Sequence, residues 1–375
     1  MGWTRREALA GAGAALLALR AGTADAMPAG APAPLRMARG FDLRPSGVRW
    51  PGVVEDYREF RKQPYAPPLI ARSSLIRFWA DWPVLQPSPA PLEDPANPGY
   101  GHLVALDGQI DAARADGLDV IVMPYRYPLW ATGATRWRWG VAEQYQLPDA
   151  GHGPYSPWAA FCEALWRRYA GRMTHFEVVN EPNLQLMPQG DMPERVAVMV
   201  TTVDAIARRH GLAATCLAPS CSDADSLRVP PRMTPLPEFA DRMLEALDTA
   251  GFAGGDHWVW SFHNYNESEN GGRRSTLMRE RIAGRWRGRL APDGEPLMYA
   301  TEGGVRLSFI ARRRGAGADL RAGQAEVLAR ALARAETTPG LGLYTQYTVN
   351  ADPKYDCGLR ETDARPRPSF DVFVA

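Results

Sequence analysis

Short apolar runs alternate with longer amphipathic segments along most of this chain, and this alternation limits the possible folds more than any other feature. The runs that we expect to form strands are residues 37–43, 74–79, 118–123, 175–179, 214–218, 257–263, 297–301 and 342–347. Helical spacing of apolar residues predicts helices between them: three end before Gly117, Gly171 and Gly211, and three cover residues 237–250, 276–284 and 322–335. Such alternation requires parallel strands buried on both faces and predicts an α/β protein.

The number of predicted strands favours one closed barrel. Eight runs in a chain of 375 residues, without an internal Pro/Gly/Ser-rich linker, fit a single (β/α)8 TIM barrel. A doubly wound open sheet is the alternative. The Gly-rich phosphate-binding turn typical of that fold follows none of the early strands. We therefore expect residues 27–375 to form one barrel domain.

The first 26 residues have the pattern of an export signal peptide. Two arginines at positions 5 and 6 precede an apolar run over residues 8–19, and Ala24-Asp25-Ala26 offers a cleavage site. The paired arginines indicate the twin-arginine route. The apolar run is too short for a permanent membrane anchor, and the alternative is a disordered alanine-rich leader. We expect a secreted or periplasmic protein that starts at Met27 and is not attached to a membrane once the signal is removed.

The charge balance argues against a strongly charged partner. The chain has 43 Lys and Arg against 42 Asp and Glu, a formal net charge of +1. No global field therefore attracts nucleic acid or an anionic membrane, and we expect a neutral partner and a monomeric protein. Six scattered histidines without a His-x-His pair argue against a metal-dependent hydrolase, so we expect no metal and no cofactor.

The four cysteines carry no predicted function. They are too few for a disulfide scaffold, and their spacing matches no zinc motif. Cys216 and Cys221 could pair in an oxidising compartment, or all four could be buried free thiols.

Two predicted strands run directly into a glutamate. Residues 175–179 lead to Asn180 and Glu181, and residues 297–301 lead to Glu302. The carboxyl ends of the strands form the active-site face of a barrel, so these two side chains can face each other across its mouth. Two opposed carboxylates are what glycosidic cleavage needs, one as proton donor and one as nucleophile. Close approach raises the pKa of one of the pair and keeps an acid available at neutral pH.

Several further motifs follow the strands in an order that resembles a known clan. These are Asn180-Glu181-Pro182, Glu302, Arg77 to Trp82, Pro128 to Ala131, His263-Asn264-Tyr265, Gly358-Leu359 and Arg367-Pro368. The chain is similar over most of its length to the clan A (4/7 superfamily) retaining glycoside hydrolases, cellulase- or β-xylosidase-like enzymes of the family 39 or family 5 type. The resemblance implies that residues 27–375 are a catalytic domain acting on a carbohydrate.

The resemblance also implies roles for single residues. Glu181 would be the catalytic acid/base and Glu302 the nucleophile, with their carboxyl oxygens about 5–5.5 Å apart. Asn180 would bind the sugar 2-hydroxyl, Tyr265 would hold the nucleophile, and Arg77 would keep it ionised.

Further side chains are expected to contact the sugar. His263 would line the sugar site, and Trp82 and Trp130 would offer faces for stacking. The clan usually has a tryptophan at the end of its eighth strand; this chain has none there, so Tyr344 or Tyr347 would replace it. The alternative to an enzyme is a catalytically weak carbohydrate-binding barrel. Sugar identity, linkage and endo or exo action depend on the shape of the pocket.

Overall fold

The computed structural model describes residues 36–44, 54–132, 156–184, 191–224, 234–315, 317–352 and 355–375. These residues belong to one compact unit, Leu35–Ala375. The expected export signal at residues 1–26, with its cleavage before Met27, lies outside the described residues.

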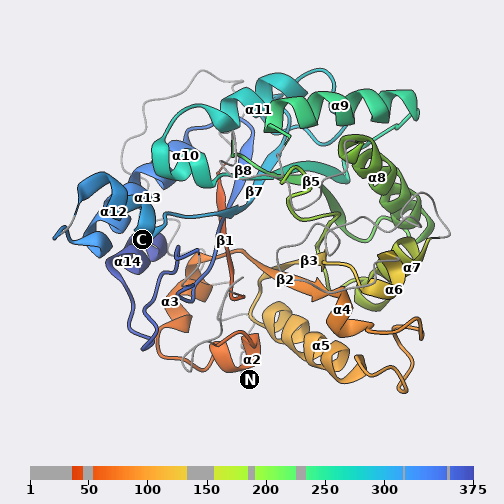
Figure 1. Cartoon of the computed structure of the whole chain (residues 1–375), viewed down its shortest axis with the longest axis horizontal. Helices are drawn as coiled ribbons and strands as arrows, with labels where there is room; N and C mark the ends of the chain where they lie inside the picture. The colour runs from red at the N-terminus through yellow and green to blue at the C-terminus, as the bar shows by residue number, and fades with distance from the viewer. Residues whose placement is uncertain are drawn as a thin grey trace, which may run out of the picture. The chain divides into compact units, whose positions relative to one another are not determined.

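Eight parallel strands close into a barrel in their order along the chain, which confirms the predicted TIM barrel (Figure 1). Closure is made by β1 and β8, where Gly40 pairs with Thr345. The strands are β1 (Ala38–Asp42), β2 (Leu75–Asp81), β3 (Asp119–Tyr125), β4 (His175–Glu177), β5 (Thr215–Ser222), β6 (Trp258–His263), β7 (Met298–Gly303) and β8 (Leu341–Gln346).

Helices surround the strands, and each of the six predicted helices is present within about two residues of its expected ends. These six are α5 (Tyr100–Ala115), α7 (Pro157–Tyr169), α8 (Met192–Arg209), α9 (Leu236–Thr249), α11 (Arg274–Ile282) and α13 (Leu320–Glu336). The shorter helices are α2 (Tyr57–Phe60), α3 (Ala66–Arg72), α4 (Trp82–Leu85), α6 (Leu129–Thr132), α10 (Tyr265–Asn270), α12 (Leu307–Arg314) and α14 (Pro368–Val374). Among the described helices, none is both long and apolar enough to cross a membrane.

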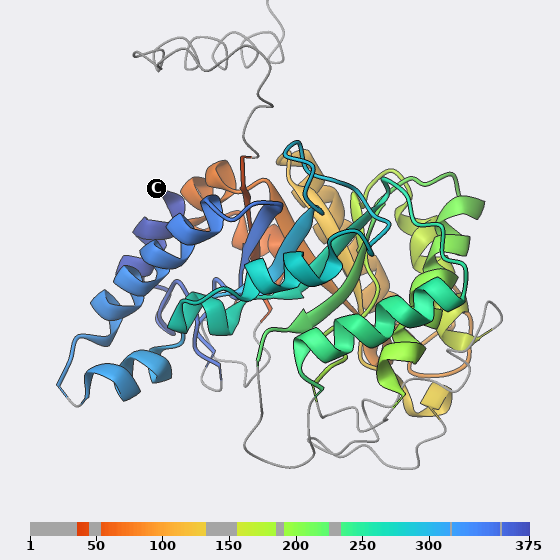
Figure 2. The same ribbon diagram turned by 90° about the horizontal axis from the view of Figure 1, so that it is seen from above.

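The two ends of the described fold lie beside each other. The last helix, α14, packs against α13 and against α3, which precedes β2 (Figure 2). Arg39 of β1 adds a direct bond here, because its guanidinium donates to the carbonyl oxygen of Phe373. The barrel is therefore fastened where its first and last strands meet.

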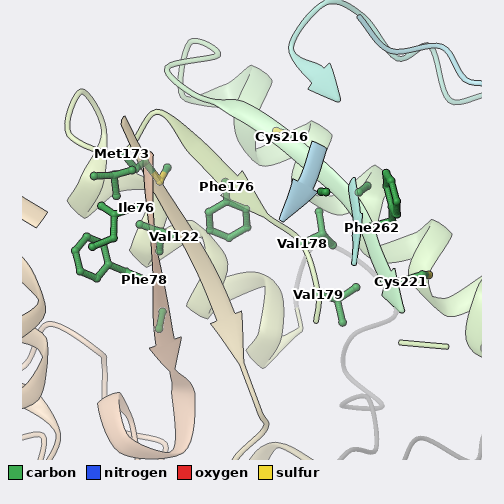
Figure 3. Packing of buried hydrophobic residues seen from close by; sticks show 14 of the residues in the cluster. Ile76, Phe78, Val122, Met173, Phe176, Val178, Val179, Cys216, Cys221 and Phe262 are labelled. Atoms are coloured by element: carbon green, nitrogen blue, oxygen red, sulfur yellow. The ribbon is translucent and has the colours of Figure 1, made fainter. Parts of the chain in front are cut away.

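Side chains alternate between the two faces of each strand, as the period of a β-strand requires. One set packs outward against the helices in a large apolar core, part of which is shown in Figure 3, where Ile76, Val122 and Met173 lie near one another and Phe176 lies beside Val178. A smaller apolar cluster, which includes Leu75, Ile121, Leu217, Val259 and Leu343, uses the other face.

The face that carries this smaller cluster becomes polar toward the carboxyl ends of the strands. Two residues after Leu75 on β2 comes Arg77, and two residues after His175 on β4 comes Glu177. On β6 the same face carries Ser261 and His263. All of these polar side chains are buried, with exposed fractions of 8% or less. A polar layer therefore separates the apolar layer from the mouth of the barrel.

Candidate active site

Glu302 lies next to the end of β7, and side chains from β2, from β6 and from the turn after β6 surround its carboxylate. The guanidinium of Arg77 donates from Nη1 to Glu302 Oε1, and the hydroxyl of Tyr265 donates to Oε2 at 2.8 Å. His263 Nδ1 lies 3.4 Å from Oε2. The side chain is only 6% exposed. Arg77 and Tyr265 thus hold one carboxyl oxygen each, and the hydrogen bond from the charged guanidinium is the stronger kind.

Glu181 follows β4 in a backbone conformation that is costly for a residue other than glycine. Its φ is +43°, in the left-handed region, which costs on the order of 1–3 kcal/mol. A hydrogen bond from its backbone N–H to the carbonyl oxygen of Ser220, 3.0 Å long, holds this turn. The side chain is 22% exposed, and Oε1 lies 2.9 Å from His263 Nδ1. The strained turn thus directs a partly accessible carboxyl group toward His263 and Glu302.

Arg77 is a fully buried cation that connects the carboxylates of the site. Besides Glu302, it donates from Nε to Glu177 Oε2 at 2.5 Å and from Nη2 to Asn180 Oδ1 at 2.8 Å. Asp42 Oδ2 lies 3.7 Å from Nη1. The rigid, planar fork of an arginine suits this task, since it can bond several partners in fixed directions.

Glu177 is a buried carboxylate that sequence reasoning missed. Its Oε1 accepts hydrogen bonds from Thr301 Oγ1, at 2.7 Å, and from Ser220 Oγ, while Oε2 accepts from Arg77. Its position inside an apolar strand hid it. The one available signal was the period of two, which puts Glu177 on the same face of β4 as His175, four residues before Glu181.

Burial and neighbouring charges shift the ionisation of this layer. Burial raises the pKa of Glu177, but Arg77 and the hydrogen bonds to the carboxylate outweigh it, so its pKa lies below the ordinary value. Burial raises the pKa of Asp42 to about 7 against the opposing charge of Arg77, with a smaller contribution from Glu302. Burial and the nearby Glu302 also raise the pKa of Tyr265, which therefore stays protonated as a donor.

A cavity of about 490 Å³ opens above the two glutamates. Its described lining combines the site residues with aromatic and polar side chains from the ends of β2, β3, β5 and β6 and from the segment after β8. They are Trp79, Tyr125, Asn180, Glu181, Leu184, Ser222, Asp223, Ala224, Tyr265, Asn266, Glu302, Arg306, Tyr347 and Tyr355. The size suits a small ligand or a few sugar-sized units, and the mixture of aromatic faces with hydrogen-bonding groups is typical of a binding site.

Besides Arg77, which is buried and donates to Glu302, four of the predicted substrate-binding residues do not line this cavity within the described part of the chain. Trp82 is fully buried, stacks on Phe161 at 4.7 Å and donates to Gln86, so the structure does not bring it to the cavity. Trp130 packs edge-on against Trp82 and donates to the Gln86 carbonyl oxygen. Both tryptophans pack on the outer side of the barrel mouth.

The other two are Tyr344 and His263. Tyr344 is fully buried on the outward face of β8, with its hydroxyl 3.3 Å from Ser268 Oγ, so it does not reach the cavity either. Three residues later, Tyr347 does line the cavity, so of the two tyrosines proposed to replace the missing tryptophan only Tyr347 is in position. His263 is fully buried below the cavity and contacts the two glutamates instead of an open site.

Three ionisable side chains of the site are close enough to share a cation. One atom each from Glu181, His263 and Glu302 lies within 4.8 Å of the other two. Hydrogen-bond donors already meet both oxygens of Glu302, and the fixed charge of Arg77 beside it opposes a second cation. Protons fit this cluster better than a metal ion. All four cysteines are buried free thiols, so Cys216 and Cys221 do not pair.

Comparisons with known proteins find the same fold among glycoside hydrolases. No protein-family model matches the chain, and no curated protein matches it. A family 39 glycoside hydrolase from Bacteroides cellulosilyticus WH2 superposes with a TM-score of 0.57 at 15% identity, covering 90% of this chain and 63% of that one. The chain thus spans less than two thirds of that enzyme.

Other solved structures give similar matches. A family 30 endoxylanase from Clostridium papyrosolvens C71 has a TM-score of 0.54 at 14% identity, with 92% of this chain and 72% of that chain covered. A monomeric β-xylosidase from Caulobacter crescentus CB15 has a TM-score of 0.54 at 13% identity, with 92% and 68% covered. At these identities the likeness establishes a shared fold.

Proposed function

We propose that this protein is an exported retaining glycosidase that hydrolyses O-glycosidic bonds of an oligosaccharide, polysaccharide or glycoconjugate. The observation that carries the proposal is the pair of Glu181 and Glu302 beside the cavity, with one carboxyl oxygen of each within 4.8 Å of the other. Retaining enzymes separate their carboxyl groups by about 5–5.5 Å and inverting enzymes by about 6.5–9.5 Å. The short separation leaves no room for a water between the carboxylate and the sugar, and so favours the retaining class.

The two glutamates have environments suited to different roles. Glu302 accepts hydrogen bonds from Arg77 and Tyr265 and is almost buried, so its carboxylate is fixed in position, which suits a nucleophile. Glu181 is more exposed and contacts His263, a group with which it can share a hydrogen, which suits an acid that must gain and lose a proton.

In the first step, Glu302 would attack the anomeric carbon while Glu181 gives its proton to the departing glycosidic oxygen. This step leaves the sugar as an ester of Glu302 and Glu181 as a carboxylate. Glu181 would then remove a proton from water as the water oxygen attacks the anomeric carbon and the ester bond to Glu302 breaks. Two inversions at the same carbon retain its configuration.

Asn180 and the aromatic walls would bind the sugar. Arg77 donates to Asn180 Oδ1, which leaves the Nδ2 hydrogens as donors for a sugar hydroxyl beside the nucleophile. Trp79, Tyr125, Tyr347 and Tyr355 offer faces and edges on which the apolar side of a sugar ring can pack.

Chemical rescue of two variants tests the assignment. In Glu181→Ala, an activated aryl glycoside needs little protonation, so the glycosyl-enzyme should form, and azide should release it as a product of retained configuration. In Glu302→Ala, azide can attack only directly, and the product should have inverted configuration. Both variants should lose on the order of 10²-fold or more in kcat on substrates with poor leaving groups.

The exposed Glu245 of α9 provides a matched control, since Glu245→Ala removes a carboxylate that does not line the cavity and should leave activity unchanged. Reversed stereochemistry in the two rescues would exchange the roles of Glu181 and Glu302. Full activity in both alanine variants would refute the site, and binding of sugars without any hydrolysis by the unmodified protein would favour a binding protein instead.

A further inference from the structure

His263 has both ring nitrogens engaged although it is fully buried. Nδ1 faces the two glutamates, at 2.9 Å from Glu181 Oε1 and 3.4 Å from Glu302 Oε2. On the opposite side of the ring, Nε2 lies 3.1 Å from Ser220 Oγ. The position of the ring hydrogens therefore depends on what Ser220 can accept or donate.

Ser220 has only one hydroxyl hydrogen, and Glu177 requires it. The carboxylate of Glu177 can only accept, and Ser220 Oγ donates to its Oε1. Thr301 also donates to this oxygen, at 2.7 Å, so its hydroxyl hydrogen is not directed at Ser220 either. Ser220 is left as an acceptor toward the ring. For the 3.1 Å contact to be a hydrogen bond, the hydrogen must be on His263 Nε2.

We propose that Ser220 and Glu177 are positioning residues that keep a hydrogen on His263 Nε2 and so reserve Nδ1 for exchanging a proton with Glu181. In a neutral ring with this tautomer, Nδ1 has no hydrogen and can only accept a hydrogen bond through its lone pair. Its 2.9 Å contact with Glu181 Oε1 then needs a hydrogen from the carboxyl group. In the opposite tautomer, Nδ1–H would satisfy an ionised Glu181, and the pair would hold one hydrogen fewer.

The extra hydrogen is the one that acid catalysis needs, and in this respect the inference rests on the proposed function. The proton moves between Glu181 Oε1 and His263 Nδ1, so that a carboxyl group and a neutral ring become a carboxylate and an imidazolium. No other reactant takes part. The pair can thus hold a proton close to the cavity in either form.

Every charged or titratable group that faces His263 acts on this exchange. Burial lowers the pKa of His263, but the carboxylates of Glu302 and Glu181 outweigh it and raise the pKa above the ordinary value, against an opposing contribution from Arg77. Glu177 acts through Ser220, and Tyr265 lies with its ring edge-on at 6.2 Å. These surroundings favour a ring that readily takes a second proton from Glu181.

Nuclear magnetic resonance of the ¹⁵N-histidine-labelled protein tests the hydrogen position without reference to activity. The His263 signals are assigned by their loss in His263→Asn. In the unmodified protein, Nε2 should keep a directly bonded hydrogen over the whole pH titration, and the Nδ1 signal should be the one that moves. An Nδ1–H tautomer with a bare Nε2 at high pH would overturn the proposal.

Two serine variants add the kinetic consequence. Ser220→Ala removes the acceptor for Nε2–H, and kcat/KM should fall about tenfold for glycosides with poor leaving groups but by less than about threefold for an activated aryl glycoside. The control is Ser261→Ala. Ser261, on β6, is fully buried like Ser220 on β5, yet its Oγ has no hydrogen-bond partner in the described structure. This control should change neither substrate class nor the His263 spectrum.

The spectra and the kinetics separate the two proposals. An unmodified protein with the expected Nε2–H signal but without glycosidase activity would contradict the proposed function and leave the hydrogen assignment intact. Equal losses for both substrate classes in Ser220→Ala, with an unchanged His263 spectrum, would mean that Ser220 is merely structural.

Discussion

His175 opens β4 on the same face as Glu177, and its ring packs against Tyr299 with centroids 5.6 Å apart. Burial lowers its pKa from 6.5 to about 4. The unfolded chain therefore binds more protons than the folded protein between these two values, and the free energy of unfolding must fall as the pH drops through that window. A buried neutral histidine therefore destabilises the folded protein in acid. The carboxylate of Glu177, whose pKa is lowered, stabilises the folded protein at pH values above the ordinary pKa of a glutamate, and this contribution is lost as the pH falls below it.

Replacing His175 by Phe should remove this part of the acid sensitivity. At about 1.4 kcal/mol per unit, the lowered pKa corresponds to about 3 kcal/mol lost between pH 7 and pH 4. Urea unfolding at a series of pH values should show the difference between the unmodified protein and His175→Phe changing by about this amount. The exposed His102 of α5 is the control, and His102→Gln should leave the pH dependence as it is. Parallel curves for His175→Phe and the unmodified protein would contradict the buried neutral histidine.

Only part of the site could be predicted from single residues. Glu181 and Glu302 stand directly after apolar strands, so position alone indicated that they meet at the barrel mouth. Trp82 and Tyr344 do not line the cavity, because the face of the strand or helix on which an aromatic residue lies decides its contacts, and residue type alone does not give that face. Tyr344 and Tyr347 are three residues apart, and side chains along a strand alternate between its two faces, so Tyr344 on β8 points outward while Tyr347 faces the cavity. Ser220 could not be found, since its role depends on Glu177 and His263 from other strands.

At the scale of elements, strands were predictable because burial on both faces leaves a continuous apolar run. The residues at which the strands begin and end were harder to predict. The strand predicted over residues 175–179 ends in the structure at Glu177, because the chain turns into the strained conformation of Glu181. β5 continues past its expected end to Ser222, with a shift in register between Pro219 and Cys221. The short helices α2, α4 and α6 escaped prediction since a single turn has no repeating pattern.

The helix α7 offers a test of how one element is stabilised. Ser156 precedes it, and its Oγ accepts a hydrogen bond from the backbone N–H of Ala159 at 2.9 Å, with Pro157 at the first helical position. Ser156→Ala should lower the free energy of unfolding by about 1 kcal/mol, because it leaves a helix-terminal N–H without its acceptor. Ser156→Asp retains an acceptor and should lose less. Denaturant titration measures both, and equal stability of the alanine variant and the unmodified protein would exclude the cap.

At the scale of the whole molecule, the fold tolerates almost complete change of sequence. Solved glycoside hydrolases with 13–15% identity share the barrel over about 90% of this chain. A barrel needs only apolar side chains on alternating strand faces and amphipathic helices to cover them, and many sequences meet that requirement. The periodic pattern of apolar residues therefore predicts the architecture. The substrate depends on the side chains that line the cavity, and these come from strand ends and loops, where the sequence has no periodic pattern to read.

The proposed export of the chain can be tested separately from the barrel. The chain has an A-x-A sequence ending at Ala26, while the first strand begins only at Ala38, so cleavage there would leave every described strand intact. N-terminal sequencing of protein recovered from outside the cytoplasm should begin at Met27. If the twin-arginine route is used, changing Arg5→Lys together with Arg6→Lys should keep the charge of the leader but stop export. Continued export of that double variant would assign the signal to the general secretory route. An intact Met1 on exported protein would refute the cleavage site.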